Sequence, residues 1–157
     1  MLELLTPENI KENWERYKDN LKVAFTSSEG SDFVTGEGSE DIYKVIYNRL
    51  TNPFSQIMHL WSEGEEDYIV LTQLQESDST GKRTLVLFSA TRTKDINEET
   101  IANRYYEAYQ TISKFARDNK CVGMYCYSDL DYFAELAEQT KEYTNVITRY
   151  QFYFPLN

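Results

Sequence analysis

The sequence predicts an α/β fold (α+β by another convention), with a mixed, mostly antiparallel sheet flanked by helices. Apolar residues recur at steps of three and four in the first third of the chain, which is typical of amphipathic helices. Three apolar runs with a period of two follow, joined by short polar turns, which favours an antiparallel meander. Helical and strand patterns then alternate, as a parallel strand pair with a helical crossover requires. The predicted order is α-α-β-β-β-α-β-α-β.

The chain has 157 residues, which suits a single domain spanning 1–157, and contains no internal repeat or linker. Apolar residues make up 41% and charged residues 27%, which excludes a wholly disordered chain. With 16 basic and 26 acidic residues, the formal net charge is −10. Because nucleic acids and anionic membranes are bound through Lys and Arg, we expect neither as a direct partner.

Two helices are predicted before the first strand. Thr6 can cap the first one, Pro7 suits its first position, and its apolar stripe is Ile10, Trp14, Tyr17, Leu21 and Phe25. Residues 27–38 are small, polar and rich in glycine, and predict a mobile loop. Ser39 caps the second helix, Asn52-Pro53 ends it, and its apolar residues are Ile42, Val45, Ile46 and Leu50.

The meander is predicted from three runs, 57–61, 68–74 and 83–90, with polar turns at 62–67 and 77–81. The third run is apolar on both faces from Leu85 to Phe88, which predicts a sheet covered on both sides. The first run holds the only histidine, His59, which we expect to face a loop or a subunit interface. The acids from Glu63 to Asp67 lack the spacing of a cation site and predict a solvated turn.

The remaining elements alternate. Asp95 and Glu98 have the spacing of a capping box and open a helix that Asp118-Asn119 can close. A buried strand follows at 121–127, and its odd spacing places Cys121 and Cys126 on opposite faces as reduced thiols. Ser128 or Asp129 caps a last helix that buries Leu130, Phe133, Ala134 and Ala137. The final strand is Val146 to Phe154, and Pro155 stops it.

This order of elements, together with the run from Ile112 to Tyr125, resembles the GNAT acyl-CoA N-acyltransferase fold, and specifically its small divergent relatives in tailed phages. Such relatives often end the long helix with a Phe-Ala-Arg-like step, as Phe115-Ala116-Arg117 does here. They open the next strand with a Gly-Cys-like pair, where this chain has Lys120-Cys121. The resemblance implies a coenzyme A site between the fourth strand of the family and its long helix.

The family's diphosphate loop, of the pattern Gln/Arg-x-x-Gly-x-Gly/Ala, is missing. The matching segment, 90–100, contains no glycine and carries Asp95, Glu98 and Glu99. Because a diphosphate needs close, uncrowded amides and repels like charges, we expect no cofactor and no catalytic residue. If the chain is active, the resemblance implies acetyl-CoA as cofactor. Its contacts would then be Thr91, Arg92, Thr93, Lys94 and Asn97, with Cys126, Tyr127 and Tyr132 near the chemistry.

The surplus of tyrosine, 13 residues, predicts aromatic surface for contact with other proteins. The candidate interface residues are Tyr106, Tyr109, Tyr150, Phe152 and Phe154. We therefore expect a non-catalytic, GNAT-like phage protein that acts through protein contacts, with itself or with other virion subunits, as a virion or virion-assembly component.

Two alternatives remain open: an active acetyl-CoA-dependent N-acetyltransferase with a divergent loop, and an acidic inhibitor of a host nucleic-acid-binding enzyme. The N-terminal residues have no basic segment and no unbroken apolar stretch of a secretory signal, and no apolar run approaches the roughly 20 residues of a membrane span. The expected location is the host cytoplasm during synthesis, and then the virion. No metal site is expected.

Overall fold

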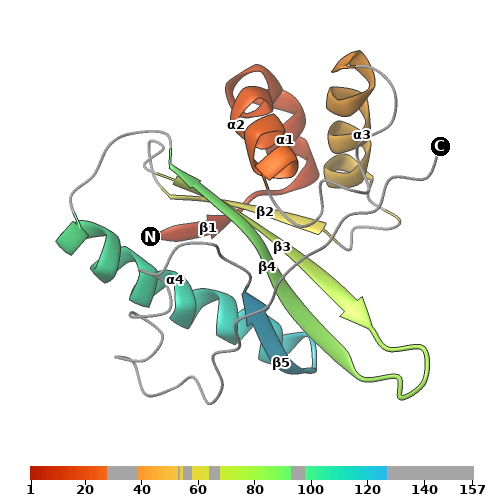
Figure 1. The fold of residues 1–157 in the computed structure, drawn as a ribbon, viewed down its shortest axis with the longest axis vertical. Helices are drawn as coiled ribbons and strands as arrows, with labels where there is room; N and C mark the ends of the chain where they lie inside the picture. The colour runs from red at the N-terminus through yellow and green to blue at the C-terminus, as the bar shows by residue number, and fades with distance from the viewer. Residues whose placement is uncertain (28–38, 53, 55–57, 64–67, 93–97, 127–157) are drawn as a thin grey trace. The chain divides into compact units, whose positions relative to one another are not determined.

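The computed structural model describes residues 1–27, 39–52, 54, 58–63, 68–92 and 98–126. The chain divides into two compact units, Met1–Tyr127 and Ser128–Asn157, and every described element belongs to the first. These elements are β1 (Leu2–Leu4), α1 (Pro7–Glu12), α2 (Trp14–Ser27), α3 (Ser39–Thr51), β2 (Met58–Glu63), β3 (Tyr68–Glu76), β4 (Arg83–Arg92), α4 (Glu98–Asp118) and β5 (Cys121–Cys126) (Figure 1). The predicted last helix, the predicted last strand and almost all of the predicted 27–38 loop lie outside the described residues.

The described strands form one sheet in the order β1-β2-β3-β4-β5. The pairs from β1 to β4 are antiparallel, so the predicted meander of β2, β3 and β4 is confirmed. The β4–β5 pair is parallel and is connected through α4, as predicted. Strand β1 was not predicted, because three residues with Glu3 in the centre show too little alternation to be recognised.

Both faces of the sheet are covered, as the sequence predicts. On one face, α1, α2 and α3 pack on β2 and β3 through a cluster of buried residues: Ile10, Tyr17, Leu21, Ile46, Leu50, Met58, Leu60, Ile69 and Leu71. On the other face, α4 packs through a second cluster: Leu2, Trp61, Val70, Leu85, Ala108, Ile112 and Ala116. The strands β2 and β3 therefore contribute alternate residues to two separate cores.

The first predicted helix is two helices with a break at Asn13. Its start is as predicted: the Thr6 hydroxyl accepts a hydrogen bond from the Asn9 N–H at 3.1 Å, and the Asn9 side chain accepts one from the Thr6 N–H at 3.2 Å. At the break, the Asn13 side chain donates to the Asn9 carbonyl at 2.9 Å. Such local bonds from asparagine compete with the helical ladder, and α2 restarts at Trp14 in the same apolar register.

The turn between β3 and β4 is the predicted one. The Ser77 N–H bonds to the Lys82 carbonyl at 2.9 Å, and the Gly81 N–H bonds to the Ser77 carbonyl at 2.8 Å. Gly81 has φ +64°, a conformation that glycine adopts without a Cβ penalty. The hairpin therefore depends on glycine at this position.

Candidate functional site

The parallel strands β4 and β5 have their carboxyl ends on the same side of the sheet. Strand β4 pairs with β3 along its whole length, and it pairs with β5 from Arg83 to Leu87, which lies opposite Cys126, the last described residue of β5. Leu71 on β3 pairs with Ser89 on β4, and the next residue, Thr72, pairs with Leu87. Phe88 on β4 therefore has no paired residue on β3. A bulge therefore lies at Phe88, directly after the last described β4–β5 pair. Ligands of α/β sheets tend to bind at the carboxyl ends of parallel strands, which makes the carboxyl ends of β4 and β5 the candidate site.

The long helix α4 follows β4 in the sequence. It starts at Glu98 and has 21 residues. A helix N-terminus carries a partial positive charge and free amides, which favour an anion. Here the first two helical positions are Glu98 and Glu99, which are themselves anionic.

Three of the eight residues named for the active alternative lie in described strands. Thr91 and Arg92 end β4, where they pair with Ile69 and Tyr68. Cys126 ends β5 opposite Leu87, at the same edge of the sheet. The other five, Thr93, Lys94, Asn97, Tyr127 and Tyr132, lie outside the described residues, as does Asp95.

A buried polar line on β2 was not recognised from the sequence. His59, Trp61 and Glu63 share the sheet face under α4, and all three are at least nine-tenths buried. The ring of Phe115 on α4 meets His59 and Trp61 edge-to-face, each with centroids 5.1 Å apart. The Trp61 indole N–H donates to the Thr72 hydroxyl at 2.9 Å. His59 therefore packs inside the chain, and the expectation that it faces a loop or an interface is wrong.

Glu63 is a buried carboxylate and not part of a solvated turn, because it is the last residue of β2 and is only 8% exposed. Its Oε1 accepts a hydrogen bond from the amino group of Met1 at 2.7 Å and lies 3.8 Å from Nη1 of Arg104 on α4. That hydrogen bond raises the pKa of the Met1 amino group above its ordinary value of 8.0. The period-two pattern His59, Trp61, Glu63 is the signal that would have placed Glu63 inside.

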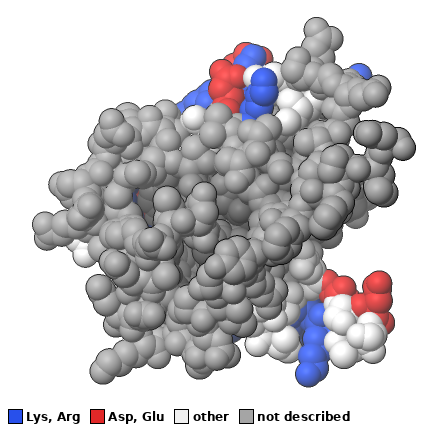
Figure 2. Space-filling view, viewed as in Figure 1, with Lys and Arg blue, Asp and Glu red and all other residues white. Residues whose placement is uncertain are grey.

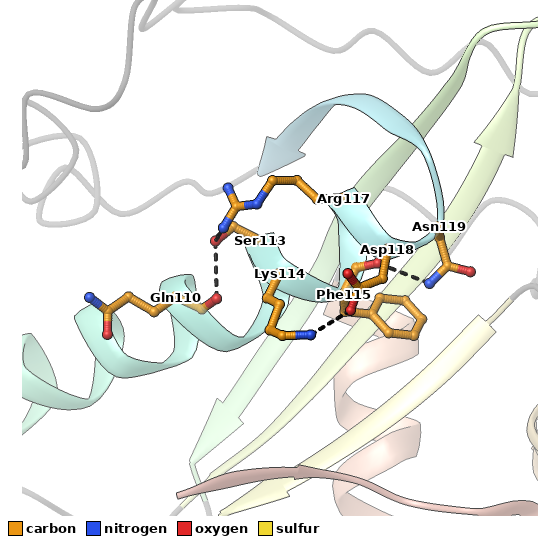
Figure 3. Close-up of polar contacts among 7 residues, drawn as sticks. All are labelled: Gln110, Ser113, Lys114, Phe115, Arg117, Asp118 and Asn119. Carbon is orange, nitrogen blue, oxygen red and sulfur yellow. Dashed lines mark hydrogen bonds and ion pairs between the residues drawn. The ribbon is translucent and has the colours of Figure 1, made fainter.

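The end of α4 is fixed by local polar contacts (Figure 3). Lys114 forms an ion pair with Asp118 at 2.7 Å, and the Asn119 side chain donates to the Phe115 carbonyl at 2.9 Å. The chain then turns into β5 through Lys120, whose φ is +60°. A left-handed residue is required here, a conformation that glycine adopts most readily.

Cys121 opens β5 as a half-buried free thiol. Burial raises the pKa of this thiol, and the nearby charge of Arg83 offsets only part of that effect. A raised pKa means little thiolate at neutral pH, so Cys121 is a poor nucleophile. The side chain of Cys126 lies outside the described residues.

The candidate interface is described only in α4. Tyr106 is 45% exposed, and Tyr109 is partly buried. Tyr150, Phe152 and Phe154 lie outside the described residues. On the visible face, Lys or Arg and Asp or Glu occur side by side in the described parts and do not form a field of one sign (Figure 2).

Within the described ranges, no group of three His, Cys, Asp or Glu side chains is placed to hold a metal ion. Among the helices that the structure describes, none combines the length and the apolar character that a membrane crossing requires.

At the level of sequence, no family model and no curated protein matches the chain. Solved acetyltransferases match its fold along nearly its whole length. An aminoglycoside acetyltransferase from an uncultured soil metagenomic sample, solved with sisomicin, has a TM-score of 0.64 at 13% identity, covering 100% of this chain and 96% of its own. The ribosomal-protein-alanine N-acetyltransferase of Brucella melitensis biovar Abortus 2308 has a TM-score of 0.61 at 11% identity, covering 99% of each chain.

A third match is a GNAT family acetyltransferase of Staphylococcus aureus, with a TM-score of 0.55 at 9% identity, covering 99% of this chain and 98% of its own. The chain therefore has a GNAT-like fold, and the expected fold class is confirmed. At these identities the likeness concerns the fold alone.

Proposed function

We propose that this chain is a GNAT-like protein that has lost coenzyme chemistry and acts through contacts with other proteins, as a virion or virion-assembly component. The observation that carries the proposal is the start of α4. Two glutamates occupy its first two positions, and no glycine occurs from Ala90 to Thr100.

The physical reason is electrostatic and steric. A diphosphate binds where several amides point at it without crowding, and glycine permits the close backbone approach. Two carboxylates within roughly 4–6 Å of a diphosphate would raise its free energy by an amount that Arg92 and Lys94 offset only in part. Acidic residues in the first turn favour the positive end of a helix, so this sequence suits the start of a helix better than it suits an anion site.

Titration with acetyl-CoA tests the loss of coenzyme binding. A ligand at a hundredfold its Kd stabilises the folded state by about 2.7 kcal/mol, which a thermal melt detects. We expect no shift at millimolar acetyl-CoA. An active acetyltransferase of the same fold, melted under the same conditions, is the positive control. A saturable shift for this chain would contradict the proposal.

The contact role has its own test. If the proposal holds, the chain is encoded by a phage, and mass spectrometry of particles purified from that phage should detect it in mature or in immature particles. Absence from both kinds of particle would remove the virion role and leave the coenzyme result untouched.

A second candidate is an acyl-CoA N-acyltransferase with an unorthodox loop. It is supported by the likeness of the fold to solved acetyltransferases, which covers nearly the whole chain. In this case acetyl-CoA should bind, and replacing Cys126, Tyr127 or Tyr132 should lower turnover more than binding.

A further inference from the structure

A groove lies on the helical layer of α1, α2 and α3, on the face of the sheet opposite α4. It has a volume of about 720 Å³ and is bordered by α1, the start of α2 and α3. Its lining residues are Lys11, Glu12, Trp14, Glu15, Tyr43, Lys44 and Tyr47. The three aromatic side chains are half-buried, and the four charged ones are exposed.

The aromatic floor is held in place by its neighbours. Trp14 and Tyr47 meet edge-to-face with centroids 5.1 Å apart. The Tyr43 hydroxyl donates to Asp19 at 3.0 Å, and the ammonium of Lys22 lies 5.3 Å from the Tyr43 ring centre. Rings fixed in this way lose little conformational entropy when a partner covers them.

The charges on the rim are only partly neutralised. Glu15 forms an ion pair with Lys18 at 2.6 Å. Lys11 and Glu12 on α1 and Lys44 on α3 have no ion pair within the part of the chain that the structure describes. The groove therefore offers an available anion on one wall and available cations on both walls.

We propose that this groove is the contact between two copies of the chain related by a two-fold axis. In such an interface the same patch meets itself, so Glu12 of one copy would face Lys44 of the other, twice. A purely acidic partner could pair only with the lysines of the groove, and a purely basic partner only with its glutamates. The proposal rests on the proposed contact function, because it names a partner for it.

Net charge supports this location. Two copies that each carry a formal net charge of −10 repel each other. Salt screens this repulsion beyond the Debye length, which is about 8 Å at physiological salt, so the charges close to the contact matter most. The rim has two lysines and two glutamates, so its own formal charge is zero. The rim itself therefore adds no net charge repulsion when two copies meet there.

Sedimentation analysis over a concentration series tests the proposal. We expect Glu12→Lys and Lys44→Glu each to weaken self-association by roughly tenfold, because each change turns two attractive contacts into repulsive ones. An equimolar mixture of these two variants should recover it, because both contacts become attractive again in the mixed dimer. The double variant E12K/K44E should recover it as well.

Lys82→Glu is the matched control, since Lys82 is an exposed residue of the β3–β4 turn and its replacement changes the net charge as Lys44→Glu does. It should leave association unchanged. A wild-type chain that stays monomeric at every concentration overturns the proposal, as does a dimer that neither single variant weakens. Acetyl-CoA binding would overturn the proposed function instead, so the two failures are distinguishable.

Discussion

At the scale of single residues, Glu63 links three elements. Its carboxylate lies on β2, accepts a hydrogen bond from the Met1 amino group beside β1, and attracts Arg104 on α4. Because its side chain is only 10% exposed, water replaces these partners poorly if they are removed. The negative charge of Glu63, between the Met1 amino group and Arg104, therefore helps to hold β1 and α4 on the sheet.

Glu63→Gln should lower the free energy of unfolding by about 1–2 kcal/mol, because a charge-assisted hydrogen bond is lost from a buried position. Urea unfolding measures the change. Glu76→Gln is the control: its ion pair with Arg83 is exposed and 3.6 Å long, so its loss should cost less than about 0.5 kcal/mol. Equal effects of the two variants would show that Glu63 has no special role.

The same contact predicts a pH dependence. The pKa of the Met1 amino group is raised in the folded state, so its contribution is fully present below 8.0 and is lost as the pH rises through the higher folded value. The difference in unfolding free energy between wild type and Glu63→Gln should therefore shrink above pH 8. A difference that stays constant up to pH 10 would contradict the assignment.

Lys120 is the second informative residue, because it is a non-glycine residue with φ +60°. Lys120→Gly should raise the free energy of unfolding by about 1 kcal/mol, since glycine removes the left-handed Cβ clash. Lys120→Ala keeps the Cβ and should change little. Gly81→Ala should lower the free energy of unfolding, because its φ is +64° and a Cβ is strained in this conformation. No atom lies within 4 Å of the added Cβ, so the loss comes from the backbone conformation and not from a clash with neighbours. Thermal melts of the three variants compare them directly.

At the scale of elements, sequence periodicity predicts most of what the structure shows. The stripes of Ile10, Tyr17 and Leu21 and of Ala108 and Ile112 are buried, as predicted. What it misses depends on single bonds or on partners distant in sequence: the break at Asn13 comes from one side-chain bond, and β1 is defined by pairing with β2. The bulge at Phe88 is likewise visible only against β3.

The second half of α4 packs on the sheet through Ile112, Ala116 and the ring of Phe115. Phe115→Ala should lower the free energy of unfolding by about 2–4 kcal/mol, because it removes a ring that contacts both His59 and Trp61 and leaves a cavity under the helix. Phe115→Leu fills part of that space and should cost about half as much. Chemical denaturation distinguishes the two, and an equal loss would argue against a packing role.

At the scale of the whole molecule, the sequence predicts the GNAT-like fold more completely than the candidate site. The order of elements predicted the fold, since the described elements other than β1 left a pattern in the sequence. The candidate site was predicted only as a segment, because its geometry depends on pairing between strands that are distant in sequence. The fold limits where a ligand could bind, and the proposed loss of coenzyme binding depends on the charges at the start of α4.

The sharing of β2 and β3 between two cores has a consequence for how the molecule opens. Either helical layer can detach while the opposite one still covers the central strands, so the two layers should behave as separate cooperative units. Deuterium would then enter the amides of α1–α3 and of α4 at different rates. The amides of Leu60 and Leu71, at the centre of the two shared strands, would exchange last and report global unfolding.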